Sequence, residues 1–215
     1  MRPDDWVRDC YLSLILAWVL LFGVVLVHEA AHWACARGLG FSAPRVVIGV
    51  GPSFFRMRWQ ESFWHFQLFP LMGYVYYRRG PRSTAVQRVS VALAGPAANL
   101  ALAGVLYALV PDPGSLGGSC CGPLALVQLA ADAYQQGIMA SLHLFADFNL
   151  GVGVFNLLPL PTLDGGVLLE EPGRALQRAA PRFIDERWWS RAWSQCGAAL
   201  IIAVNVLWLL SDFLF

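Results

Sequence analysis

Four long apolar runs constrain what this 215-residue chain can fold into. They lie at about 11–34, 89–110, 138–158 and 196–215, and each is long enough to cross the roughly 30 Å hydrocarbon core of a bilayer. Hydrophobic residues make up 57% of the chain and charged residues 13%, which is more apolar than an average soluble domain. The sequence therefore predicts an α-helical polytopic membrane protein with about four transmembrane helices, folded as a single domain over 1–215.

The first apolar run ends in the sequence HEAAH, residues His28–His32. Positions i and i+4 lie on the same face of a helix, so the two imidazoles can bind one metal ion. Ionisable groups are costly in a membrane-length helix and need a partner or a function, and Leu12–Val27 carries none. A lone HExxH match also arises by chance, so this motif alone leaves a metal site and a coincidence both open.

A second motif, Asn156–Gly166 (NLLPLPTLDGG), ends the third apolar run. Pro159 and Pro161 lack amide donors and should end the helix there. The following Gly165–Gly166 pair allows a sharp turn that brings Asp164 back towards the helices. Zinc commonly takes two histidines, one carboxylate and a water, so Asp164 is the natural third ligand of a single zinc ion. An N-cap role for Asp164, at the start of a helix over 165–176, is compatible with this interpretation.

The region between the first two runs, about 46–77, alternates apolar and polar residues with strand periodicity. We expect a small antiparallel β-sheet lying against the membrane. Four short strands are predicted: Val46–Val50, Ser53–Trp59, Phe63–Phe69 and Gly73–Tyr77. Packing is the usual role of such a sheet, but an exposed strand edge can also pair with an extended substrate. The candidate substrate-binding residues are Gly73, Tyr74, Val75 and Tyr76.

The distribution of arginines orients the predicted spans. Arginines cluster between the first and second runs and between the third and fourth, whereas Pro111–Gly137 contains none. We expect a multi-pass protein of a cell membrane, of the bacterial inner-membrane kind, and the arginines give its orientation. Both termini should lie outside, and the HEAAH end of the first span should lie near the cytoplasm. The net charge of +1 gives no indication of a nucleic-acid partner.

Four further features carry expectations. Small residues around Asn99 favour close helix packing, with the Asn99 amide bonding across helices. His143 is expected to be a core histidine, and the role of Asp147 stays open. Cys10 could form a disulfide with Cys120 or Cys121 if the external compartment is oxidising.

The HEAAH and NLLPLPTLDGG motifs together resemble the site-2 protease family of intramembrane zinc metallopeptidases. Two more elements are similar to that family: Pro70–Val75 (PLMGYV) to its PLGGYV strand, and Ala94–Asn99 (AGPAAN) to its AGPxxN element. Asn149 also stands where the family often has an asparagine. Met72 replaces the first glycine of the family's usual pair, and we expect a minimal form with no PDZ or CBS domain.

The resemblance implies a zinc metalloendopeptidase with one Zn²⁺ held by His28, His32 and Asp164. Glu29 would act as the general base towards a zinc-activated water. The resemblance also suggests that Asn156 donates a hydrogen bond to the oxyanion, and a helix-bracing role for Asn156 remains the alternative. The expected partners are the lipid bilayer and transmembrane protein substrates cut by regulated intramembrane proteolysis, together with a regulatory membrane partner or a homo-oligomer.

Two other functions compete with proteolysis. A metal-binding membrane transporter would use intramembrane His and Asp side chains, but the chain has no internal repeat, and transport does not explain Glu29 beside the ligands. A catalytically silent membrane scaffold would have no need of ligands and base together.

Overall fold

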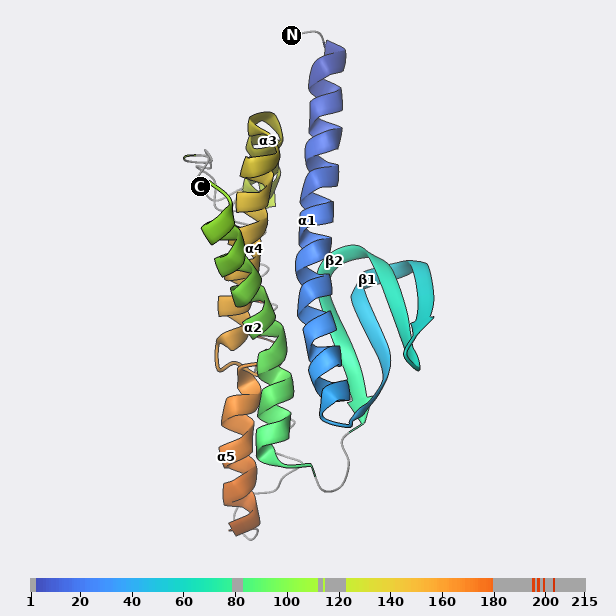
Figure 1. Ribbon diagram of the computed structural model, residues 1–215, viewed down its shortest axis with the longest axis vertical. Helices are drawn as coiled ribbons and strands as arrows, with labels where there is room; N and C mark the ends of the chain where they lie inside the picture. Colours follow the sequence, from blue (N-terminus) through green and yellow to red (C-terminus); the bar gives the residue numbers. More distant parts are fainter. Residues whose placement is uncertain are drawn as a thin grey trace.

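The computed structural model describes residues 3–78, 83–111, 114 and 123–179, with residues 195, 197, 199 and 203 beyond them. The described chain is mostly helical: its helices are α1 (Pro3–Gly38), α2 (Ala85–Leu109), α3 (Pro123–Gln136), α4 (Ile138–Leu157) and α5 (Gly166–Ala179). Figure 1 shows α1 between two layers, with a small β-sheet on one side and α2, α3 and α4 on the other.

Three of the described helices are long and apolar enough to cross a membrane. They are Arg8–Gly38 in α1, Ala85–Leu109 in α2 and Ile138–Leu157 in α4, so apolar helices of membrane length stand at three of the four predicted spans. The predicted fourth span, 196–215, lies outside the described residues except for Gly197, Ala199 and Ala203, each of which is helical. The short helix α3 lies between the second and third predicted spans, and Ala130 and Ala133 bury it against α1 and α4.

The end of α1 directs the chain into the sheet. Gly40 has a φ of 79°, a left-handed conformation that suits glycine. The Phe41 N–H donates to Ala36 O (2.9 Å) and the Gly40 N–H to Arg37 O (3.0 Å), which is the Schellman pattern for closing a helix. The first strand therefore starts immediately after the helix that carries the HEAAH motif.

The sheet has two long antiparallel strands, β1 (Ser42–Trp59) and β2 (Ser62–Arg78), where the sequence predicted four short ones. The difference arises because the chain turns at only one of the three expected breaks, Gln60–Glu61, and continues as a strand through the other two, at 51–52 and 70–72. Gly49 and Gly51, with φ values of 89° and 92°, bend β1 without ending it. A Cβ on Gly49 would lie 2.8 Å from the carbonyl oxygens of Gln67 and Phe69, so the bend also requires a residue without a side chain.

Because of these bends, one segment of β1 has pairing partners on both of its sides. Arg45–Ile48 pairs with Gly73–Tyr76 and also with Phe63–Phe66. In the described register, Gly73–Tyr76 pairs only with β1, so it forms an edge of the sheet. The predicted substrate-binding residues thus lie on an edge strand, and the side chains of Tyr74 and Tyr76 are exposed.

Hydrogen bonds from two tryptophans of α1 attach the sheet to the helix. Trp18 Nε1 donates to Leu68 O (2.6 Å), and Trp33 Nε1 donates to Ser62 Oγ (2.8 Å). Trp33 also packs in an apolar cluster with residues of both strands. Since Trp18 belongs to the membrane-length part of α1, the sheet lies alongside this helix and not beyond its end.

Candidate metal centre

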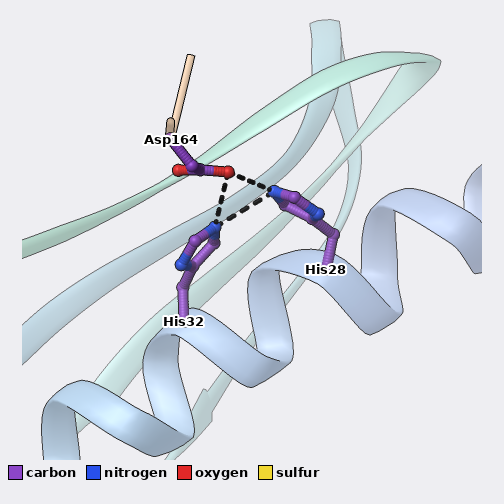
Figure 2. Close-up of side chains that lie close together, drawn as sticks. All are labelled: His28, His32 and Asp164. Carbon is purple, nitrogen blue, oxygen red and sulfur yellow. Dashed lines mark hydrogen bonds and ion pairs between the residues drawn. The ribbon is translucent and has the colours of Figure 1, made fainter. Parts of the chain in front are cut away.

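His28 and His32 lie on successive turns of α1 and point the same way (Figure 2). Their side chains are buried, and the two Nε2 atoms are 3.0 Å apart. The rings meet edge to face, with centroids 4.6 Å apart. The i, i+4 spacing therefore places two imidazole nitrogens at one point, as the sequence predicted.

The third member of the group, Asp164, reaches the histidines from the loop after α4. Asp164 Oδ2 lies 2.9 Å from His28 Nε2 and 3.2 Å from His32 Nε2 (Figure 2). The backbone of this loop folds back on the end of α4, because the Gly165 N–H donates to Asn156 O at 2.7 Å. A Cβ on Gly165 or Gly166 would collide with carbonyl oxygens of the same loop, so both positions require glycine.

These three residues are chemically suited to hold one metal ion. Each offers one ligand atom, and the three atoms lie within 4.8 Å of one another. A tetrahedral ion with bonds of about 2.0–2.1 Å separates its ligands by about 3.4 Å. The observed separations of 2.9–3.2 Å need to widen by only a few tenths of an ångström. The structure thus brings the three predicted ligands together as a group that could bind a metal.

The hydrogen bond between His32 and α2 leaves the Nε2 atom of His32 free for a metal. His32 Nδ1 lies 2.6 Å from Val91 O, which can only accept, so Nδ1 carries the proton and Nε2 keeps its lone pair. Asp164 Oδ2 faces the same point as that lone pair, since it lies 3.2 Å from His32 Nε2 and 2.9 Å from His28 Nε2. A carboxylate oxygen and two imidazole nitrogens thus converge on one point, which is the kind of ligand set that zinc takes.

Gly95 of α2 lies against the two imidazole nitrogens of the site. A Cβ on Gly95 would lie 2.7 Å from His28 Nε2 and would collide with His32 Nε2. The backbone of α2 therefore packs directly against the ligand atoms. Sequence reasoning assigned the small residues of this stretch only to helix packing and missed this role. The AGPAAN element was the available signal.

Glu29 is buried next to the histidines, with 6% of its surface exposed. It lies against the edge of the sheet: a Cβ on Gly73 would be 2.6 Å from Glu29 Cγ and 2.8 Å from its Oε1. Only a glycine lets the strand approach so closely. The predicted catalytic carboxylate and the predicted substrate-binding strand are consequently neighbours.

Asn156 and Asn99 differ in what they contact. Asn156 Nδ2 donates to Val152 O (3.0 Å) in its own helix, so its hydrogen bond to a reacting oxyanion stays a prediction. Asn99 crosses from α2 to α1, where its Nδ2 lies 3.4 Å from His28 Nδ1. This contact confirms the expected cross-helix hydrogen bond.

An ion pair between α2 and α5 supports the loop that carries Asp164. The Arg88 guanidinium donates to both carboxylate oxygens of Glu171, through Nε at 2.6 Å and through its Nη2. Both side chains are buried, at 7% and 9% exposed. The pair fixes the helix that follows Asp164 against α2. Sequence reasoning missed it because no spacing signal links residues 83 positions apart.

The remaining candidates lie away from this group. His143 Nε2 donates to Val110 O (2.8 Å), which supports the expectation of a structural histidine. The Tyr107 hydroxyl donates to Asp147 Oδ1 (2.5 Å), so Asp147 helps to join α4 to α2. Cys10 is a free thiol in the described chain, and its proposed partners, Cys120 and Cys121, lie outside the described residues.

Comparisons with known proteins agree with this arrangement. The family model described as Peptidase family M50 matches residues 16–113 and 116–204. A Staphylococcus aureus protein named "Putative zinc metalloprotease SA1105" is 41% identical over 66 residues, 30% of this chain and 15% of that protein. A similarly named protein of Clostridium acetobutylicum is 29% identical over 111 residues, 46% of this chain and 32% of that protein. The matches therefore span less than a third of these curated relatives.

The fold is also similar to a solved structure. The site-2 protease from Methanocaldococcus jannaschii superimposes with a TM-score of 0.50 over 95% of this chain and 79% of that one, at 19% sequence identity.

Proposed function

The chain belongs to peptidase family M50, which confirms its resemblance to the site-2 proteases, and from that premise we propose that it is an intramembrane zinc metalloprotease. Its substrates are the transmembrane segments of membrane proteins. The observation that carries the proposal is the meeting of His28, His32 and Asp164 within a membrane-length helix bundle, with Glu29 buried beside them. A structural ion would need no neighbouring carboxylate outside its ligand set.

His28, His32 and Asp164 would hold one Zn²⁺, which when bound supplies a Lewis acid that activates water and polarises a carbonyl. Glu29 takes a proton from the attacking water and delivers it to the amine that leaves. Asn156 would add a hydrogen bond to the developing oxyanion once its amide turns away from Val152 O. The buried position of Glu29 keeps bulk water from competing for these protons.

The substrate must be unwound before it can be cut. A peptide bond inside a helix is sheltered by i→i−4 hydrogen bonds, and unpaired backbone groups cost several kcal/mol each in lipid. The edge segment Gly73–Tyr76 can supply replacement partners by strand addition. Its position against Glu29 supports this role, because a strand paired there would lie next to the catalytic carboxylate.

Proline substitutions on this edge test the strand-addition proposal. Amides alternate in direction along a strand, so either Val75→Pro or Tyr76→Pro removes an amide from the outer edge. One of these variants should lose cleavage while keeping its metal and its melting temperature. Val75→Leu and Tyr76→Phe retain the amide and serve as controls, with near wild-type cleavage expected. Wild-type rates in both proline variants, each shown to be folded, would rule out strand addition at this edge.

We place the protein in a cell membrane of the bacterial inner-membrane kind, with four spans, both termini outside and the site near the cytoplasm. The arginine asymmetry supports this orientation. Reporter fusions at Gly118 and Arg178 should report opposite sides, with Arg178 in the cytoplasm. A cytoplasmic signal from the Gly118 fusion would reverse the orientation. A regulatory membrane partner and a homo-oligomer remain predictions.

Metal removal tests the proposed activity directly. The purified chain, reconstituted with a membrane-protein reporter that carries a helix-destabilised transmembrane segment, should cut the reporter within that segment. A zinc chelator should stop cleavage, and added zinc should restore it. Cleavage that continues after the metal content has fallen to background would exclude a metalloprotease. Bound metal without any cleavage would favour the metal-binding transporter or scaffold.

A further inference from the structure

Asn99 is fully buried, at 0% exposed, and contacts His28 on the ring nitrogen that faces away from Asp164. Asn99 Nδ2 is 3.4 Å from His28 Nδ1, while Asn99 Oδ1 is one of three buried side-chain nitrogen or oxygen atoms in the described residues without a hydrogen-bond partner. A buried carbonyl oxygen left unpaired costs about 1–3 kcal/mol. This orphan atom requires an explanation.

The chemistry of imidazole supplies one. A neutral ring has one N–H donor and one acceptor nitrogen. If His28 Nδ1 accepted from Asn99 Nδ2, the proton would sit on Nε2, and the atom that faces Asp164 and His32 would have no lone pair for a metal. The oxygen and nitrogen of a side-chain amide occupy equivalent positions, so the amide can equally be placed with Oδ1 towards the ring.

We propose that Asn99 is a positioning residue whose Oδ1 accepts the Nδ1–H of His28, which fixes the tautomer with Nε2 free to bind metal. Turning the Asn99 amide in this way gives its Oδ1 a hydrogen-bond donor and leaves the Nε2 of His28 with a lone pair for the metal. His32 receives the same support from α2, because Val91 O accepts from its Nδ1 at 2.6 Å. The two histidines of α1 are thus both oriented by acceptors of α2.

The spacing within α2 is consistent with this role. Gly95 and Asn99 are four residues apart and therefore lie on one face of the helix. Gly95 leaves room for the two Nε2 atoms, and Asn99 holds the far side of the His28 ring. The inference rests on the proposed metal centre, but it concerns binding of the metal and not the cutting of substrate.

Competition with a zinc chelator measures this role on the purified full chain. Asn99→Leu, which has similar volume but no acceptor, should weaken zinc binding by about 10- to 100-fold, the usual effect of losing such a hydrogen bond. Asn99→Asp keeps an oxygen acceptor and should bind zinc much more tightly than the leucine variant. Asn149→Leu is the control: Asn149 is equally buried and also has an unpaired Oδ1, but its amide bonds within α4, so zinc affinity should not change.

Equal weakening in the leucine and aspartate variants, or unchanged affinity in the leucine variant, would overturn the proposal. If Asn99→Leu does not fold, the wild-type protein still decides the question. Nitrogen NMR of ¹⁵N-histidine-labelled protein should show the His28 proton on Nδ1, and a proton on Nε2 would contradict the proposal. A protein that binds zinc with this tautomer yet cuts no reporter would leave the inference standing and remove the proteolytic function.

Discussion

Replacing Glu29 with Gln lowers the rate of reporter cleavage by about 10²- to 10⁴-fold, the range expected when a general base is removed. Gln has nearly the same shape but cannot take a proton from water. The metal should stay in place, because Glu29 is outside the group formed by His28, His32 and Asp164. Cleavage is measured on reconstituted protein by the appearance of the shortened reporter, and zinc is measured by mass spectrometry on the same sample.

Glu61→Gln is the matched control for this experiment. Glu61 is an exposed carboxylate that pairs with Arg37 at 3.5 Å, so its removal tests for a general effect of charge loss. It should leave both cleavage and zinc unchanged. A Glu29→Gln protein that cuts at the wild-type rate would show that another group supplies the base. Loss of zinc from that protein would instead make Glu29 part of the metal site.

Gly95→Ala should weaken zinc binding by about 100-fold, because the new methyl group occupies the space of the ligand atoms. A Cβ there would lie 2.7 Å from His28 Nε2 and collide with His32 Nε2. Neither imidazole can withdraw freely, since Val91 O holds the ring of His32 and Asn99 contacts that of His28. Overpacking of this kind costs about 3 kcal/mol at its upper end, which corresponds to the stated loss of affinity.

Gly104→Ala separates this steric effect from a general effect on α2. Gly104 lies in the same helix, and a Cβ added to it meets nothing within 4 Å. This variant should keep its zinc and melt at or slightly above the wild-type temperature, because alanine favours helix over glycine. Zinc retention by Gly95→Ala at wild-type affinity would mean that α2 does not press on the ligand atoms as described.

The parts of the fold that were predictable from the sequence are those set by local pattern. Hydropathy located three spans to within a few residues, since about 20 apolar residues can hardly be placed elsewhere. Strand periodicity located the sheet. It did not show that β1 continues through Gly49 and Gly51, because glycine marks a bend as readily as a break.

The same distinction holds for the site: residues placed by local spacing were predictable, and residues placed by helix packing were not. The histidine pair follows from i, i+4 spacing, and Asp164 was predicted because two prolines and two glycines fix where the chain can turn. Gly95 and the Arg88–Glu171 pair could not be predicted in this way. Their roles depend on which face of α2 meets α1 and α5, and an apolar helix with little amphipathic pattern does not reveal that face.

X-ray absorption at the zinc edge of the purified wild-type protein tests the central claim most directly. The account predicts one zinc per chain with nitrogen and oxygen ligands at about 2.0–2.2 Å, two of them imidazoles. Zinc should be lost from His28→Ala, His32→Ala and Asp164→Ala proteins. A sulfur ligand at about 2.3 Å, as Cys35 one turn away could supply, or a protein that binds no zinc at all, would contradict the assignment of His28, His32 and Asp164 as the metal centre.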